Sequence, residues 1–377
     1  MMRRQLALAA IAACLSPAAG VAQGILGGQG FGYPAGQQGA RAAGTAGALA
    51  PFDAVSPANP ASVSDWLRGA IFFHAEPEYR STTTGGPSSS TRSTRFPLVG
   101  GGTRISPRLA MGLTLSTYLD RTWETTATNT DTVGGTAVAL SKRFASSGAI
   151  NDLRIAFGWT PSAKLRLGAA FHAYTGENRL AVSWIFPDST PLLGVTQTST
   201  LAYSGSALSA GAEWKAVSHV VVAAYGRLGA TARLRVGDTL AATGHMPDHL
   251  GLALHYDGIR GTVLAAGWER IGWTAMRGLG SASLGVHDTE RMSLGAESRG
   301  PQVAGSPLFL RLGASRRTLP FDANTGIVHE SMFSFGTGMS VGSGRGNIDL
   351  AVQRAHRTGG SATERAWLFR FGLTITP

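Results

Sequence analysis

Two short motifs have residue types and spacings that are used in catalysis or metal binding. Gly338-Met339-Ser340-Val341-Gly342 matches the Gly-x-Ser-x-Gly pattern of serine hydrolases, which needs a strand–turn–helix elbow to expose the serine. Ser340 instead lies late in a segment of alternating apolar residues, which predicts a strand. His245 and His249 are four residues apart, but Pro247 between them argues against a shared helical face. We therefore expect no enzyme activity, no catalytic residue, no metal site and no cofactor.

A second set of residues is suited to binding an anionic ligand. Arg154, Arg166, His172, Tyr174 and Arg311 take the polar positions in segments where every second residue is apolar, so they share the polar face of the predicted strands. The planar guanidinium of arginine binds a carboxylate through two parallel hydrogen bonds. These five residues are therefore ligand candidates, although mixed charges on such a face also pair with one another.

The segments that must position these residues run from about position 66 to the end of the chain. Leu109, Met111, Leu113 and Leu115 alternate with small or polar residues, which predicts a strand with one apolar and one polar face. A soluble sandwich buries the apolar face inside the protein, whereas a transmembrane barrel turns it toward lipid. The direction of the apolar face therefore separates two classes of protein.

The N-terminus has the pattern of a secretory signal peptide. Two arginines precede an apolar run over 6–15, and small residues end at Ala22, so we expect residues 1–22 to be removed. This run is too short to span a bilayer. A lipoprotein signal around Cys14 is the alternative interpretation.

Composition narrows the class of the exported chain. It has 43% hydrophobic residues, 51 glycines and a single cysteine, which lies in the signal segment, so no disulfide or cysteine-ligated metal is expected. No later stretch reaches the roughly 18 consecutive apolar residues of a transmembrane helix. The formal net charge is +11, but the basic residues are scattered singly, so we expect no nucleic-acid partner. The chain is either a large soluble all-β protein or an outer-membrane barrel.

The lengths of the connections favour the barrel. Tight turns, such as that at Ser106-Pro107, alternate along the chain with longer polar connections, such as that around 236–246. Barrels of this class have short turns on the periplasmic side and longer loops outside. Seven hairpins predict an all-β, 14-stranded antiparallel transmembrane β-barrel. The segment Thr136 to Phe144 stays ambiguous between outer loop and an extension of the fourth strand.

The last strand agrees with this interpretation. Trp367, Phe369, Phe371, Leu373 and Ile375 occupy alternate positions near the C-terminus. Outer-membrane barrels end in such a strand, which the barrel-insertion machinery recognises, so we expect that machinery as a partner during biogenesis. The final residue here is a proline rather than the usual aromatic, and a proline is tolerable at a strand end.

The segments before and between the strands suggest two further parts. Residues 23–65, rich in glycine and alanine, are predicted to form a plug, since a barrel of this size is too wide for its own side chains to fill, and residues 66–377 form the barrel.

In the third outer connection an apolar cluster is a candidate surface for capturing ligands. The alternative is that the cluster forms a lid or continues two long strands. Its members are Leu180, Val182, Trp184, Ile185, Phe186, Leu192 and Leu193.

The chain resembles the FadL-type outer-membrane transporters of long-chain fatty acids and aromatic hydrocarbons. The resemblance rests on the Gly/Ala-rich segment followed by Asn59-Pro60-Ala61, on the phrase Ala156-Phe157-Gly158-Trp159-Thr160-Pro161 and on the region from Phe309 to Gly338. It covers nearly the whole chain after the signal segment. It implies that Asn59, Pro60 and Ala61 form a plug motif before the first barrel strand.

The resemblance also implies a function. The expected protein lies in the bacterial outer membrane among its lipids and takes up a hydrophobic small molecule without energy input. It would capture this solute on outer loops, pass it to a pocket above the plug and release it through a gap in the barrel wall. A PorV-like partner of a secretion or assembly system, whose N-terminal phrase is similar, is the alternative, and an outer-membrane hydrolase is a third.

Overall fold

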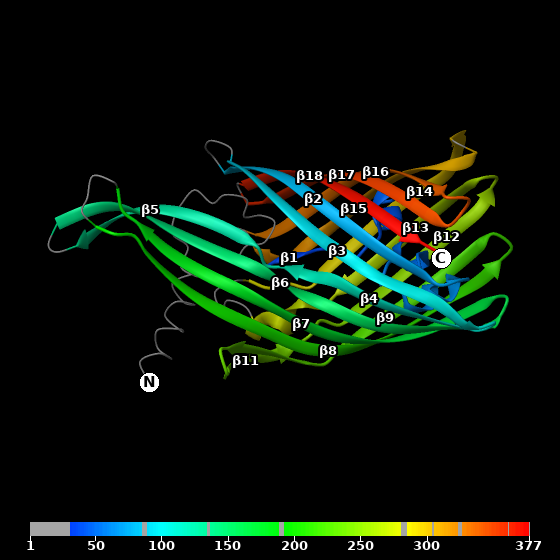
Figure 1. Cartoon of the computed structure of the whole chain (residues 1–377), viewed down its shortest axis with the longest axis horizontal. Helices are drawn as coiled ribbons and strands as arrows, with labels where there is room; N and C mark the ends of the chain where they lie inside the picture. Colours follow the sequence, from blue (N-terminus) through cyan, green and yellow to red (C-terminus); the bar gives the residue numbers. More distant parts are fainter. Residues whose placement is uncertain are drawn as a thin grey trace.

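The computed structural model describes residues 31–376 apart from 85–88, 134–135, 188–191, 280–284, 304, 323–325 and 361. The predicted signal peptide lies outside the described residues. The chain forms one closed antiparallel barrel of fourteen wall strands, in which the last strand pairs with the first (Figure 1). The wall strands are β2 (Ala70–Thr84), β3 (Ser89–Ser106), β4 (Leu109–Asp120), β6 (Thr136–Ser162), β7 (Leu165–Ile185), β8 (Val195–Val217), β9 (Val220–Gly229), β12 (His249–Ile259), β13 (Thr262–Ile271), β14 (Thr289–Val303), β15 (Ser306–Asp322), β16 (Ile327–Val341), β17 (Gly346–Gly359) and β18 (Ala362–Ile375). The predicted strand number and topology are confirmed.

The connections separate by length, as the sequence predicts. Turns such as 107–108, 163–164 and 218–219 gather at one end, called here the turn end, and the C-terminus lies at this end (Figure 1). The longer connections lie at the opposite loop end. Thr136 to Phe144 belongs to β6, so this segment extends the fourth strand. It pairs with the additional strand β5 (Trp123–Val133) beyond the end of β4.

Side chains alternate across the wall with the period of a strand. On β4, Met111, Leu113 and Leu115 are exposed on the outside, while Ala110 and Thr114 are buried inside. On β18, Trp367 and Phe371 face outward and Arg370 is buried. The apolar face therefore surrounds the barrel and the polar face lines the lumen. No described helix has the length and apolar character needed to cross a membrane.

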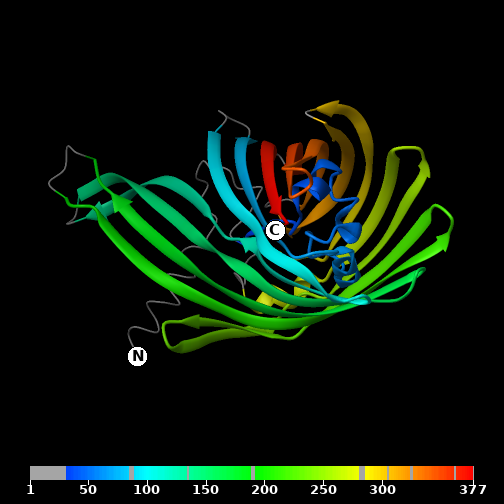
Figure 2. The same ribbon diagram turned by 45° about the vertical axis from the view of Figure 1, so that its right-hand side comes forward.

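Residues 31–65 lie inside the barrel as a plug (Figure 2). The plug comprises β1 (Tyr33–Pro34), the short helix α2 (Ala40–Gly44) and the 3-10 turns η1 (Ala50–Phe52) and η2 (Pro60–Asp65). Helix α2 packs on the wall around β15 to β18, and η2 packs on β4 and β6 to β8. The plug therefore contacts opposite sides of the wall.

The loop end carries extra structure. Strands β10 (Thr231–Val236) and β11 (Thr239–His245) form a hairpin that pairs with β8, and the 3-10 segment η3 (Trp273–Leu279) packs against β11. Together with β5, the long ends of β6, β7 and β8 project beyond the rest of the barrel (Figure 1).

One interval of the wall has no backbone ladder. Between β3 and β4 the pairing runs from Ser106 opposite Leu109 to Leu98 opposite Ser116 and then stops. Toward the loop end, β3 pairs only with β2, while Leu119 and Asp120 of β4 pair with Pro34 and Tyr33 of the plug. We call this unpaired interval, between residues 89–97 of β3 and 117–120 of β4, the seam.

Candidate lumen pocket

A pocket lies between the plug and the wall in the middle of the lumen. Plug residues that include Pro34, Gln37 and Pro57 line it on one side, and residues of strands β4, β7 to β9 and β12 to β15 together with Trp273 of η3 line it on the other. Its volume is about 80 Å³. A cavity that binds benzene measures roughly 150 Å³, so this pocket admits a ring only if the plug or a side chain moves.

The rings of Tyr118 and Trp273 line the side of the pocket next to the seam, and two further aromatic rings pack against them. Tyr118 of β4 stacks on Trp273 of η3 with ring centroids 5.2 Å apart, and it packs against Tyr174 of β7 at 4.9 Å. Phe31 contacts Trp273 edge-on at 5.8 Å. All four rings are buried. Tyr118 follows directly on the last β3–β4 ladder pairs, so this aromatic cluster adjoins the seam.

In the same part of the wall, three polar side chains on adjacent strands form a chain of hydrogen bonds. Both carboxylate oxygens of Asp152 lie within hydrogen-bond distance of His172 Nδ1, at 2.9 and 3.0 Å. His172 Nε2 lies 2.9 Å from Ser209 Oγ. From the plug, Gln37 donates a hydrogen bond of 2.9 Å to Asp152 and one of 2.6 Å to Ser116. Asp152, His172 and Ser209 come from β6, β7 and β8 in order.

Two buried arginines stand beside this chain. Arg154 is opposite His172 in the β6–β7 ladder, and Arg227 is opposite Ser209 in the β8–β9 ladder. Arg227 donates to the Tyr118 hydroxyl at 3.2 Å, but its Nε, like Nε and Nη2 of Arg154, has no hydrogen-bond partner among the described residues. Buried donors without partners are costly, so these groups suit an oxygen-bearing ligand or water.

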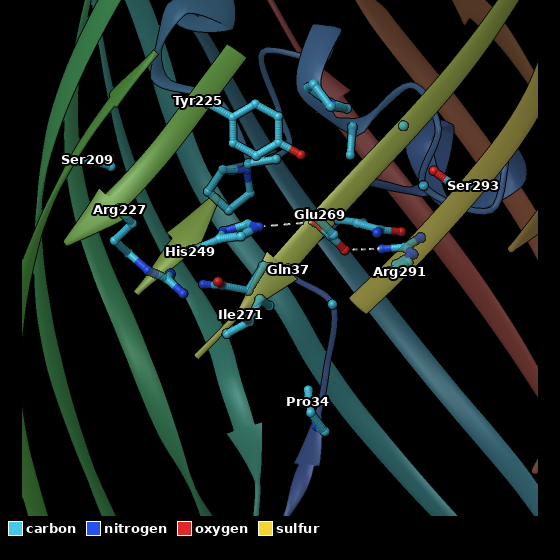
Figure 3. A pocket seen from close by; sticks show the side chains of 18 of the residues that line it. Pro34, Gln37, Ser209, Tyr225, Arg227, His249, Glu269, Ile271, Arg291 and Ser293 are labelled. Atoms are coloured by element: carbon cyan, nitrogen blue, oxygen red, sulfur yellow. Dashed lines mark hydrogen bonds and ion pairs between the residues drawn. The ribbon is translucent and has the colours of Figure 1, made fainter. Parts of the chain in front are cut away.

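The opposite side of the pocket holds a second polar group (Figure 3). Glu269 lies between His249 and Arg291, at 3.3 Å from His249 Nε2 and 3.1 Å from an Arg291 Nη atom. Arg291 also donates to the carbonyl of Ala46 in the plug. Arg291 therefore neutralises the carboxylate of Glu269 and also holds the plug. Its N–H donors are used in these contacts rather than directed at the pocket.

The sequence-predicted ligand candidates divide into two groups. Arg154, His172 and Tyr174 come together at one side of the pocket, where His172 lines it and the other two lie against His172. Arg166 is instead paired with Asp65 at 2.8 Å and Glu213 at 3.0 Å near the turn end. Arg311 is paired with Glu297 and Asp349, each at 2.6 Å, beside α2. Alternation identified the face that each arginine occupies but not its neighbours.

Several residues that line the pocket or contact its lining were not singled out from the sequence. Asp152, Ser209, Arg227 and Tyr118 alternate with outward apolar residues, as in Tyr225-Gly226-Arg227-Leu228, so the same pattern indicates their lumen face. Trp273 lies in a connection where no periodicity predicts its inward direction.

Asn59, Pro60 and Ala61 form the start of η2 at the wall. The Asn59 side chain accepts a hydrogen bond from the Ala61 amide at 3.0 Å and donates to Pro51 O and to Glu213 at 3.1 and 3.3 Å. It therefore caps η2 and joins two parts of the plug to β8. The close approach depends on missing side chains, because a Cβ at Gly211 would overlap Asn59, and one at Gly168 would overlap Pro60 and Ala61.

The predicted capture cluster does not form one exposed loop. Leu180, Val182, Trp184 and Ile185 belong to β7, which corrects their assignment to a connection, and Val182 is buried. Phe186, Leu192 and Leu193 follow the strand at the hairpin end, where Leu193 is 88% exposed. The alternative of two continued long strands describes this region, because the alternation of Leu180, Val182 and Trp184 continues the pattern of β7.

Other chemistry is sparse in the described lumen. The Ser340 hydroxyl donates to Asn347 at 2.6 Å within the β16–β17 hairpin, so the Gly-x-Ser-x-Gly motif forms no strand–turn–helix elbow. Among the described residues, no group of three or more His, Cys, Asp or Glu is placed to hold a metal ion.

Comparison with known proteins gives a fold but no sequence family. No family model matches the sequence, and no curated protein matches it. Among solved structures, a Pseudomonas aeruginosa FadL homologue matches with a TM-score of 0.63 at 12% identity, over 92% of this chain and 99% of that one. The Ralstonia pickettii toluene transporter TbuX matches with a TM-score of 0.61 at 14% identity, over 91% and 99%. The Pseudomonas putida toluene transporter TodX matches at 0.56 and 16%, over 85% and 93%. The chain therefore has the FadL-type transporter fold.

Proposed function

We propose that the protein is an outer-membrane passive transporter for hydrophobic small molecules, such as long-chain fatty acids or aromatic hydrocarbons. The fold supports this proposal, since two of the solved structures with the same fold are described as toluene transporters. The belt of exposed leucine, phenylalanine and tryptophan supports insertion among outer-membrane lipids. The C-terminal strand supports delivery by the barrel-insertion machinery.

The observation that carries the proposal is the aromatic cluster beside the seam. Tyr118 belongs to the seam itself, and Phe96, on the other strand of the seam, is 63% exposed on the outside. A solute held against Tyr118 therefore has only side chains and the plug between it and the lipid. No wall ladder has to break for it to leave sideways.

One side-chain bridge spans the seam in the closed state. Arg95 Nε of β3 donates to Asp120 of β4 at 2.5 Å, and Arg95 is also paired with Glu76 at 3.1 Å. The plug fills the rest of the interval through β1. Movement of residues 31–34 together with Arg95 opens a route from the pocket to lipid. The same movement enlarges a pocket that is otherwise too small for a ring.

Arg154 and Arg227, whose unpartnered donors lie on the strands beside His172 and Ser209, define the binding role within this route. We assign Arg154 and Arg227 as the groups that hold the carboxylate of an acidic solute, with His172 and Tyr174 beside them. Exposed Ile185 and Leu193 at the end of the β7–β8 hairpin are assigned to the initial capture. Arg166 and Arg311 are already paired and are assigned to holding the plug.

Uptake by whole cells tests the proposed function. A strain lacking the protein should take up a labelled long-chain fatty acid or toluene more slowly than the same strain carrying the gene. Native mass spectrometry of the purified barrel should show a bound lipid-like molecule. Equal uptake across a panel of fatty acids and aromatic hydrocarbons would contradict the proposal, and co-purification of a large assembly with an empty lumen would favour a secretion partner instead.

A further inference from the structure

The chain of Asp152, His172 and Ser209 has the connectivity of a nucleophile, its base and the acid that orients the base. A serine hydroxyl lies 2.9 Å from one ring nitrogen, and a carboxylate lies 2.9 Å from the other. This arrangement is recognised by geometry and roles, whatever the fold that carries it. It is also distinct from Ser340, whose hydroxyl is hydrogen-bonded to an asparagine.

The carboxylate fixes the direction of the hydrogen bonds. Asp152 is fully buried and accepts at both oxygens, so the neutral ring of His172 carries its proton on Nδ1 and donates it to Asp152. Nε2 then holds a lone pair and accepts the Ser209 O–H. Gln37 donates to the same carboxylate from the plug, which holds Asp152 in place. The ring nitrogen facing Ser209 is therefore in the state that a general base requires.

Donors for a developing negative charge lie on both sides of this pair. Arg227 is the direct cross-strand neighbour of Ser209, and Arg154 is that of His172. Both guanidinium groups are buried and carry N–H groups without partners among the described residues. Pre-positioned donors of this kind stabilise the oxyanion of an acyl-transfer intermediate. The adjoining rings of Tyr118 and Tyr174 make an apolar wall for the rest of a substrate.

We propose that Ser209 is an acylatable nucleophile and that the pocket hydrolyses small esters with an aromatic or short apolar group. Ser209 Oγ attacks the ester carbonyl carbon while His172 Nε2 takes the hydroxyl proton. The carbon–oxygen bond to the alcohol then breaks, and the leaving alkoxide takes that proton from His172. Water repeats the sequence on the acyl-serine, which releases the carboxylic acid and restores Ser209. Asp152 acts as a positioning residue for His172.

Sulfonylation with a small serine reagent tests the proposal directly. The purified barrel in detergent is incubated with methanesulfonyl fluoride, in which the serine oxygen displaces fluoride at sulfur, and the modified peptide is identified by mass spectrometry. We expect one adduct, on Ser209, which is absent in Ser209→Ala and unchanged in the control Ser340→Ala. His172→Gln should slow the modification by at least about 100-fold. Asp152→Asn should lower the rate of modification in a barrel that still migrates as a folded species.

A second experiment separates a lack of reactivity at Ser209 from a plug that keeps the reagent away from it. The same reaction is run in a Tyr33→Ala background, where the plug loses the hydrogen bonds of the Tyr33 hydroxyl with Glu330 and Arg317 of the wall, and phenyl acetate hydrolysis is measured in parallel. No adduct on Ser209 in either background, or equal hydrolysis by Ser209→Ala, would overturn the proposal. Solute uptake by Ser209→Ala cells is measured separately. Normal uptake by these cells, with no adduct on Ser209 in either background, would refute the nucleophile and leave the transport function intact.

Discussion

The hydroxyl of Tyr33, near the start of the plug, donates a hydrogen bond of 3.0 Å to Glu330 on the wall strand β16. The same hydroxyl accepts one of 2.6 Å from Arg317. Four guanidinium groups surround the tyrosine ring, the nearest being Arg357 at 4.5 Å and Arg95 at 4.9 Å from its centroid. Because Tyr33 also pairs with Asp120 in the seam, this one residue ties the seam to β15 and β16.

Removal of the Tyr33 contacts should loosen the plug in two steps. Tyr33→Phe keeps the ring among the arginines but loses the hydrogen bonds, at a cost of about 1.5–3 kcal/mol in docking free energy. Tyr33→Ala also removes the buried ring, so a further loss of about 3 kcal/mol is expected. Protease cleavage within residues 31–65 of the folded barrel measures the effect. Equal resistance of both variants and the parent would show that Tyr33 does not hold the plug.

A methyl group added to the wall where it contacts Asn59-Pro60-Ala61 should displace the plug, although no plug residue is substituted. Gly168→Ala and Gly211→Ala place a Cβ into η2, because the new atom overlaps plug atoms at both positions. Gly112→Ala is the matched control, since a Cβ there lies an ordinary 3.6 Å from Val63 of the plug. Ion conductance in planar bilayers should rise for the first two variants and stay low for the third. A rise in all three would indicate general weakening of the wall.

The two arginines of the pocket should separate acidic from neutral solutes. Arg154→Met and Arg227→Met remove the donors but keep much of the side-chain volume, so affinity for a long-chain fatty acid should fall by about tenfold or more. Affinity for toluene should change little. Arg311→Met is the comparison, since that arginine is paired with Glu297 and Asp349. A parallel loss for both solutes in the Arg154 and Arg227 variants would indicate damage to the pocket rather than loss of a carboxylate site.

The plug should dock less firmly as the pH rises. Burial raises the pKa of Asp53 above its ordinary value of 3.8, although Arg41 and a hydrogen bond from Ser56 act in the opposite direction. The docked plug therefore holds this proton more tightly than an undocked plug exposed to water. Docking loses stability as the pH increases from 3.8 through the raised pKa. Protease accessibility of the plug against pH should show this trend, and Asp53→Asn should flatten it. An identical pH profile in that variant would remove Asp53 as the cause.

The strands and their order were predictable because the alternation repeats over long segments and the turns are short. The strand from Leu109 to Leu115 follows from local pattern alone, whereas that pattern left Thr136 to Phe144 open between an outer loop and an extension of the fourth strand. The pairing of Tyr33 with Asp120 joins residues far apart in sequence, and no local pattern indicates it. The seam was therefore expected only through a family resemblance, as an unplaced gap.

The sequence predicts which face of the wall carries the site residues, but not which residues they contact. Alternation places Arg154, Arg166 and Arg311 in the lumen, yet of these three only Arg154 lies beside the pocket residue His172 with unpartnered donors. Whether an arginine is paired depends on its position along the barrel axis and on the plug residue that faces it. Neither of these follows from the alternation of residues in the sequence. The segment around Leu180 stayed open between a capture loop and two continued strands, because its alternation extends that of the preceding strand without showing where the strand ends.

A cross-link over the seam tests most directly whether solutes leave through the wall. Arg95→Cys with Asp120→Cys places two thiols on the facing strands, and a short bismaleimide joins them. The only native cysteine is Cys14. The control pair Thr103→Cys with Met111→Cys bridges positions that are already ladder partners. We predict that uptake of labelled toluene and fatty acid falls at least about tenfold when the first pair is joined, and that it is unchanged when the control pair is joined. Full uptake through a cross-linked seam would contradict lateral release.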